Sequence, residues 1–200
     1  MKNSKPKYEQ ITQKRDHNSS SPQELGEIWD FYKECGYHAP VASFTRVLDQ
    51  VSWERKRILD FGCDNGLLLN FICNELSGVE GCGIDINPRS IEEAREKVPG
   101  CQFKLFDGSK IPFSDNYFDL IFTSAVIKRI PYEDRERIYN EFKRVSRYLF
   151  VIEIDYHKKE VKSEQGWNFY LSDFRQEFAS YFDALDVRNE CGDLWGLYKL

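Results

Sequence analysis

Residues 58–66 read ILDFGCDNG and decide the fold. An apolar run of strand length passes directly into a turn with two glycines, and a helical pattern follows at once. Gly62 and Gly66 let a ligand approach the backbone closely, because a side chain would collide there. Backbone N–H groups of the turn and of the following helix start can hold a negatively charged group. The segment therefore predicts a ligand-binding turn at the end of a buried strand.

The sequence on both sides of this turn alternates between strand and helix patterns. Short apolar runs bounded by turn residues indicate strands, and apolar residues repeating every three to four positions indicate helices. The predicted strands are 57–61, 81–86, 102–106, 117–123, 148–154, 182–189 and 194–200. The predicted helices are 22–34, 41–51, 67–76, 91–97, 133–145 and 167–181.

This alternation predicts a parallel sheet with right-handed crossovers. Only about four residues separate the last two strands, whereas a parallel crossover takes roughly a dozen or more. These two strands are therefore expected to pair as an antiparallel hairpin. The predicted fold is a Rossmann-like three-layer α/β sandwich, with a seven-stranded, mostly parallel sheet whose last strand is antiparallel.

The chain of 200 residues fits one domain with a core of its own. Residues 1–21 are polar and are predicted to be a disordered tail. Residues 22–200 are predicted to form the folded domain, and 22–52 to contribute its N-terminal helices.

Charge and composition exclude several functions. The net charge is −5 although the N-terminal tail is basic, so the folded part is acidic and a poor surface for nucleic acid. No apolar run approaches the roughly 20 residues that span a bilayer, and the N-terminus lacks the apolar stretch of a secretory signal. The six cysteines show no C-x-x-C spacing, so no metal site is predicted. Reduced thiols favour the cytoplasm.

The two strands that follow the glycine turn also end in acidic residues. Asp85 closes the strand over 81–86, where its carboxylate can accept both hydroxyls of a ribose. Asp107 and Gly108 follow the next strand and are placed to meet an adenine ring. Three consecutive strand ends thus each offer one part of a site for an adenosine-containing ligand.

Five motifs in order make the chain resemble the class I S-adenosylmethionine (SAM)-dependent methyltransferases. Residues 58–66 resemble the family's glycine-rich first motif, 83–86 its ribose-binding strand end, and 106–108 its adenine motif. Residues 111–121 resemble the "PF-x-D-x-x-F-D" entry into the fourth strand, and 141–145 the helix before the fifth. The resemblance covers about residues 25–200 and includes a reversed last strand.

The resemblance implies SAM as the cofactor, no metal, and an N-terminal lid over 22–52. It assigns cofactor binding to Asp60, Gly62, Cys63, Asp64, Gly66, Asp85, Ile86, Asp107, Gly108 and Ser124. The sequence departs from the family where Asp64 replaces the middle glycine and Arg129 stands in place of a histidine found in many relatives. The resemblance therefore carries over no catalytic histidine at that position. Family members that methylate nucleobase amino groups have an Asp-Pro-Pro-Tyr-like segment after the fourth strand, and this sequence has Thr123-Ser124-Ala125 there, which argues against that activity.

The predicted activity is methyl transfer to a small polar acceptor at oxygen. A hydroxyl acceptor needs a base at neutral pH, and His157 and His38 are the candidate catalytic residues. The acceptor is expected to be a small molecule, a sugar or a peptide side chain. No nucleic acid or membrane partner is predicted. The protein is expected to be a monomer or a homodimer. Two alternatives stay open: a catalytically inactive SAM-binding or partner-binding module of the same fold, and a nicotinamide-dependent dehydrogenase. The dehydrogenase motif would need glycine in place of Leu67.

Overall fold

The computed structural model describes residues 49–76, 78–154, 169–190 and 193–200. Its strands are β1 (Arg57–Phe61), β2 (Glu80–Asp85), β3 (Gln102–Leu105), β4 (Phe118–Ser124), β5 (Ser146–Ile154), β6 (Asp183–Glu190) and β7 (Asp193–Lys199). Its helices are α4 (Leu67–Glu75), α5 (Pro88–Lys97), the short 3₁₀ helix η1 (Ile127–Arg129), α6 (Tyr132–Val145) and α7 (Phe174–Tyr181). The predicted helices over 22–34 and 41–51 and the tail over 1–21 lie outside the described residues, except for a turn at 49–50.

The seven strands form one sheet in the order β3-β2-β1-β4-β5-β7-β6. All neighbours among β1 to β5 are parallel, whereas β7 is antiparallel to both β5 and β6. The predicted sheet and its antiparallel last strand are therefore confirmed. The hairpin is placed so that β7 lies inside the sheet and β6 forms the edge.

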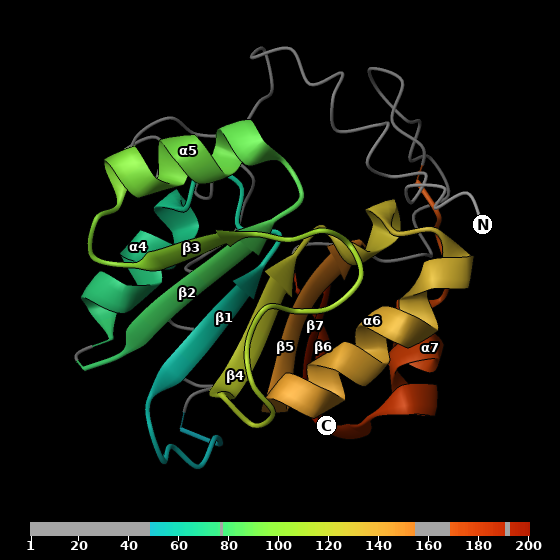
Figure 1. Ribbon diagram of the computed structural model, residues 1–200. Coiled ribbons are helices and arrows are strands. Elements are labelled where there is room, and N and C mark those ends of the chain that lie inside the picture. The colour runs from blue at the N-terminus through green and yellow to red at the C-terminus, as the bar shows by residue number, and fades with distance from the viewer. Residues whose placement is uncertain (1–48, 77, 155–168, 191–192) are drawn as a thin grey trace.

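Helices cover both faces of the sheet, which makes three layers (Figure 1). On one face, Leu69 and Ile72 of α4 and Ile91 of α5 are buried together with strand residues such as Phe122. On the other face, α6 and α7 bury an aromatic cluster against the sheet, comprising Tyr139, Phe142, Phe174, Phe178 and Tyr198. Two apolar cores therefore hold the strands in register and fix where each strand ends.

Three described helices begin at residues that differ from those predicted: α6 begins one residue earlier, and capping explains the larger differences at α5 and α7. Asn87 accepts a hydrogen bond from the Arg89 N–H, and Pro88 suits the first helical position, so α5 begins three residues earlier than expected. Asp173 accepts from the Gln176 N–H at the start of α7. The predicted helix over 167–181 was wrong at its N-terminal end, because residues 169–173 are not helical.

Asp119 of β4 fixes the chain that leads into β1. Its carboxylate accepts hydrogen bonds from the backbone N–H groups of Glu54, Arg55 and Arg57, at 3.0–3.2 Å. It also pairs with the Arg147 guanidinium at 2.8 Å, and the residue is 1% exposed. One buried carboxylate thus ties the start of the central strand to β4 and β5.

Within the described residues, no helix is both long enough and apolar enough to cross a membrane.

Candidate cofactor and acceptor site

Hydrogen bonds join the carboxyl-terminal tips of β1, β2 and β3 into one surface. The N–H groups of Gly62 and Cys63 donate to the Ile84 carbonyl at 2.8 and 3.0 Å, which links the turn after β1 to β2. The Phe106 N–H donates to the Asp85 carbonyl at 2.8 Å, which links the end of β2 to the segment after β3. The three predicted strand ends are therefore brought together, as the sequence indicated.

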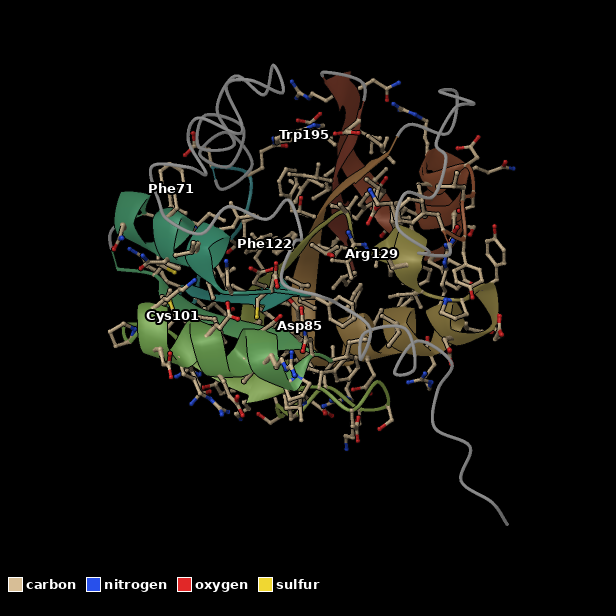
Figure 2. The ribbon with its side chains drawn as sticks, turned by 90° about the horizontal axis from the view of Figure 1, so that it is seen from above. Phe71, Asp85, Cys101, Phe122, Arg129 and Trp195 are labelled. Atoms are coloured by element: carbon tan, nitrogen blue, oxygen red, sulfur yellow. The ribbon has the colours of Figure 1, made fainter. Side chains whose placement is uncertain are left out.

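Asp85 accepts hydrogen bonds from both segments that border this surface, the turn after β1 and the start of α5. Its Oδ2 accepts from the Asp64 N–H at 3.0 Å, and its Oδ1 accepts from the Asn87 N–H at 2.8 Å. Two backbone donors from different segments thus fix the carboxylate, which is half-buried beside the glycine turn. Figure 2 shows Asp85 beside α5, with Arg129 on the α6 side of the molecule. A carboxylate oxygen has further lone pairs, so Asp85 can still accept hydroxyl donors.

The turn after β1 follows a left-handed path. Gly62, Asp64 and Gly66 all have positive φ, at 82°, 47° and 76°. Asp64 therefore adopts a conformation that glycine usually takes, and aspartate is among the few residues that tolerate it. Its side chain accepts a hydrogen bond from the Ser90 hydroxyl of α5 at 2.9 Å. The unusual Asp64 thus has a local function, because it joins the turn to α5.

Asp60 lies inside β1 beneath this turn and is 3% exposed. Burial, followed by the nearby charges of Asp85 and Asp64, holds the pKa of Asp60 well above its usual value. Asp60 therefore lies in the core of the sheet, one residue before β1 ends.

Asp107 and Gly108 follow β3, beside the end of β2. The Asp107 Oδ1 accepts from the Ser109 N–H at 2.8 Å and from the Ser109 hydroxyl at 2.6 Å. These hydrogen bonds from Ser109 outweigh the smaller effect of burial and lower the pKa of Asp107. An exposed, ionised carboxylate therefore stands at the third strand end, held in one orientation by the turn that it caps.

Ser124 and the residues after it border the glycine turn from β4. A Cβ atom on Gly62 would lie 2.5 Å from a methyl carbon of Val126, so only glycine lets the two segments approach this closely. Ser124 is half-buried at the end of β4. Of the other predicted residues, Cys63 is buried in the turn and Ile86 is half-buried directly after β2. His38 and His157 lie outside the described residues.

The side of the site formed by β4 and β5 contains a buried carboxylate. Glu153, near the end of β5, is 1% exposed, and its Oε1 accepts from the Ile127 N–H at 2.6 Å. Among the described residues, its Oε2 has no hydrogen-bond partner. Burial raises the pKa of Glu153, although the nearby Lys128 and backbone donors act in the opposite direction. The signal in the sequence was an acidic residue near the end of the otherwise apolar run over 148–154.

Lys128 is a nearby cation whose effect on the pKa of Glu153 is larger than that of Arg129. Burial lowers the pKa of Lys128, while attraction to Glu153 partly opposes that change. The Lys128 Nζ lies 5.5 Å from the centre of the Phe169 ring, and the Lys128 carbonyl accepts from the Tyr170 N–H at 2.7 Å. The 3₁₀ helix η1 is thus held between Glu153 of β5 and the segment before α7. An opposed acid and base at a strand end are typical of functional sites.

Substitution of Glu153 by Gln is expected to make the protein less sensitive to pH. Because the folded pKa of Glu153 lies above the unfolded value, its contribution to stability is fully present below about pH 4.3 and is lost as the pH rises through the folded pKa. Melting temperatures of wild type and Glu153→Gln, measured from pH 4.5 to 8, should therefore diverge in favour of the variant towards pH 8. Glu133→Gln on the exposed side of α6 serves as the control. If the difference in melting temperature between wild type and Glu153→Gln does not change with pH, the pKa of Glu153 is not raised in the folded protein.

Comparisons with known proteins agree with this geometry. Residues 58–148 match a family model described as "Methyltransferase domain". A phthiotriol/phenolphthiotriol dimycocerosates methyltransferase from Mycobacterium leprae is 29% identical over 85 residues, which is 42% of this chain and 32% of that protein. The chain thus spans about a third of the length of the curated relatives that it matches.

Solved structures show the same fold. The PH0226 protein from Pyrococcus horikoshii has a TM-score of 0.66 at 18% identity, over 82% of this chain and 90% of that one. A SAM-dependent methyltransferase from Aquifex aeolicus has a TM-score of 0.62 at 21% identity, over 78% of this chain and 87% of that one.

The sheet order, the reversed β7 and the three joined strand tips define a Rossmann-like methyltransferase fold. Together with this fold, the match over residues 58–148 to a methyltransferase domain supports a class I SAM-dependent methyltransferase, for which SAM is the cofactor.

The described residues fit that cofactor. Asp85 offers fixed carboxylate oxygens to the hydroxyls of a ribose. Glycine at 62 and 66 lets the turn pack closely against Val126 and the Phe103 ring, which holds the turn beside Asp85. Asp107 offers an acceptor at the next strand end. Among the described residues, no cluster of histidine, cysteine and acidic side chains could hold a metal ion.

Proposed function

We propose that this chain transfers a methyl group from SAM to a small polar acceptor, at an oxygen atom. The observation that carries the proposal is the fixed carboxylate of Asp85 beside the left-handed glycine turn. When bound, SAM supplies a methyl group on a positively charged sulfur, so that the leaving group is already built into the cofactor. The protein then has to hold the two reactants in line and exclude water.

The cofactor-binding functions belong to the three strand tips. Asp85 would accept the ribose hydroxyls, and Asp107 and Gly108 would meet the adenine ring. The turn over 62–66 would lie against the amino-acid part of the cofactor. Asp60 would act through the turn, because it is buried beneath it.

The acceptor would enter on the side of β4 and β5. Ser124, Lys128 and Arg129 follow β4, and Glu153 supports η1 from beneath. We retain His157 and His38 as candidate bases that take the proton of the acceptor hydroxyl. Oxygen as the acceptor atom is supported by the mycobacterial relatives, whose names give phthiotriol compounds, and hence hydroxyl-bearing molecules, as substrates.

Labelled methyl transfer tests the proposal. The full chain would be incubated with methyl-labelled SAM and a panel of hydroxylated small molecules, sugars and peptides. Incorporation into a hydroxylated acceptor, lost in Asp85→Ala, is the expected result. If SAM binds but no label is transferred to any member of the panel or to a cell extract, the chain is instead a SAM-binding module without catalysis. Label found only on nitrogen would contradict the choice of oxygen.

A further inference from the structure

Two cysteines that are far apart in the sequence meet on the face of the sheet that α4 and α5 cover. Cys73 lies in the last turns of α4, and Cys101 lies directly before β3. A Cβ atom built on Gly81 of β2 would lie 2.5 Å from the Cys73 Sγ and 2.9 Å from the Cys101 Sγ. Both sulfurs therefore stand over the same point of the sheet. The absence of a side chain at Gly81 is what gives them room.

Neither cysteine of this pair is in a disulfide, so both carry a thiol group. A hydrogen bond with Cys101 is the largest cause that raises the pKa of Cys73, and the same bond lowers the pKa of Cys101. These opposite shifts are those of a thiol that donates to a thiolate. Because the thiolate is the reactive form of cysteine, Cys101 would be the nucleophile and Cys73 its hydrogen-bond donor.

The exposure of this pair also differs from that of the other described cysteines. Cys73 and Cys101 are half-buried, so a small oxidant can reach them, whereas Cys63 and Cys82 are buried. The Cys63 Sγ contacts the Asp64 carbonyl, and the Cys82 Sγ contacts the Gln102 side chain. Among the described cysteines, the accessible thiols are thus the ones that meet.

We propose that Cys73 and Cys101 form a redox-active dithiol that a peroxide converts into a disulfide between α4 and the start of β3. The Cys101 thiolate attacks one peroxide oxygen, the O–O bond breaks, and the released hydroxide takes a proton and leaves as water. The Cys73 sulfur then attacks the resulting sulfenic acid, and its proton leaves with the hydroxyl group as a second water. Two thiols are oxidised to one disulfide while one hydrogen peroxide is reduced to two waters. This inference does not depend on the proposed methyltransferase activity.

Mass spectrometry of the reduced full chain, treated with stoichiometric hydrogen peroxide, tests the proposal. The expected product is lighter by two hydrogens, and its digest contains a peptide that joins Cys73 to Cys101. Cys73→Ser should stop at a sulfenic acid on Cys101, which dimedone traps, whereas Cys101→Ser should react far more slowly at Cys73. Cys82→Ser, which alters a buried thiol outside the pair, should form the same linked peptide as the wild type.

A measurement on the wild type alone guards against variants that fail to fold. Under limiting iodoacetamide, Cys101 is expected to be alkylated several-fold faster than Cys63 or Cys82, and prior peroxide treatment should abolish that labelling. A peroxide-treated protein in which Cys73 and Cys101 both stay reduced, or in which either forms its disulfide mainly with another cysteine, would overturn the proposal.

Discussion

Substitution of Asp119 by alanine is expected to lower the free energy of unfolding by about 2–4 kcal/mol, because each partly buried donor left without its acceptor costs about 1–3 kcal/mol. The variant leaves three backbone N–H groups, at residues 54, 55 and 57, without their acceptor, and it leaves Arg147 without a buried counter-charge. Because native proteins are stable by only about 5–15 kcal/mol, this one change would remove a large part of the total. Urea denaturation followed by circular dichroism measures it.

Asp115 provides a matched control for Asp119. It lies four residues earlier and also pairs with an arginine, Arg144 at 2.8 Å, but its side chain is 72% exposed. Asp115→Ala is therefore expected to change stability by no more than about 0.5–1 kcal/mol. Equal losses in the two variants would show that burial of Asp119 does not govern its contribution.

The carboxylate of Asp119 also predicts that the stability of the protein depends on pH. Burial alone would raise the pKa of Asp119, but hydrogen bonds from the Arg57 N–H, the Arg147 side chain and the N–H groups of 54 and 55 hold it below its usual value. A lowered folded pKa gives stability that is present above the unfolded value of about 3.9 and is lost as the pH falls through the folded one. The difference in the free energy of unfolding between wild type and Asp119→Ala should therefore become smaller below about pH 4.

Substitution of Asp85 by alanine is expected to weaken SAM binding by about 1.5–3 kcal/mol, the range for hydrogen bonds to a charged group. This corresponds to roughly a 10- to 150-fold rise in the dissociation constant. The loss has two physical sources. The ribose hydroxyls would lose their acceptor, and the N–H groups of Asp64 and Asn87 would lose the carboxylate that fixes the turn. Calorimetric titration of the folded variant with SAM measures the change.

Glu80 is the control for this substitution, because it is an exposed acid at the opposite end of the same strand. Glu80→Ala removes a negative charge from β2 without touching the strand tip, so its affinity for SAM should match that of the wild type. If both variants bind SAM as the wild type does, Asp85 is not the ribose-binding residue.

Most of the fold could be predicted from the sequence because local patterns determine it. The glycine turn, the strand periodicity and the short link between the last two strands required no knowledge of distant contacts. The helix predicted over 167–181 shows the limit of such patterns. Aromatic residues at helical spacing suggested its start, but Tyr170 instead donates its N–H to Lys128 and offers its carbonyl to Arg135. A tertiary contact therefore replaced the helical hydrogen bonds there.

Some features of the candidate site could also be predicted from the sequence, and others could not. Asp85 and Asp107 could be predicted because a parallel sheet places strand ends side by side. Three features could not be predicted: the hydrogen bond from Ile127 to Glu153, the local function of Asp64 and the contact between Cys73 and Cys101. Each depends on two segments that lie far apart in the sequence, and only packing brings them together.

Isothermal titration calorimetry of the full chain tests the central claim most directly, with SAM, its demethylated product S-adenosylhomocysteine and NAD as ligands. The joined tips of β1, β2 and β3 predict saturable binding of one SAM or one S-adenosylhomocysteine per chain and no heat of binding with NAD. Saturable binding of NAD, with no response to either adenosyl compound, would contradict the account.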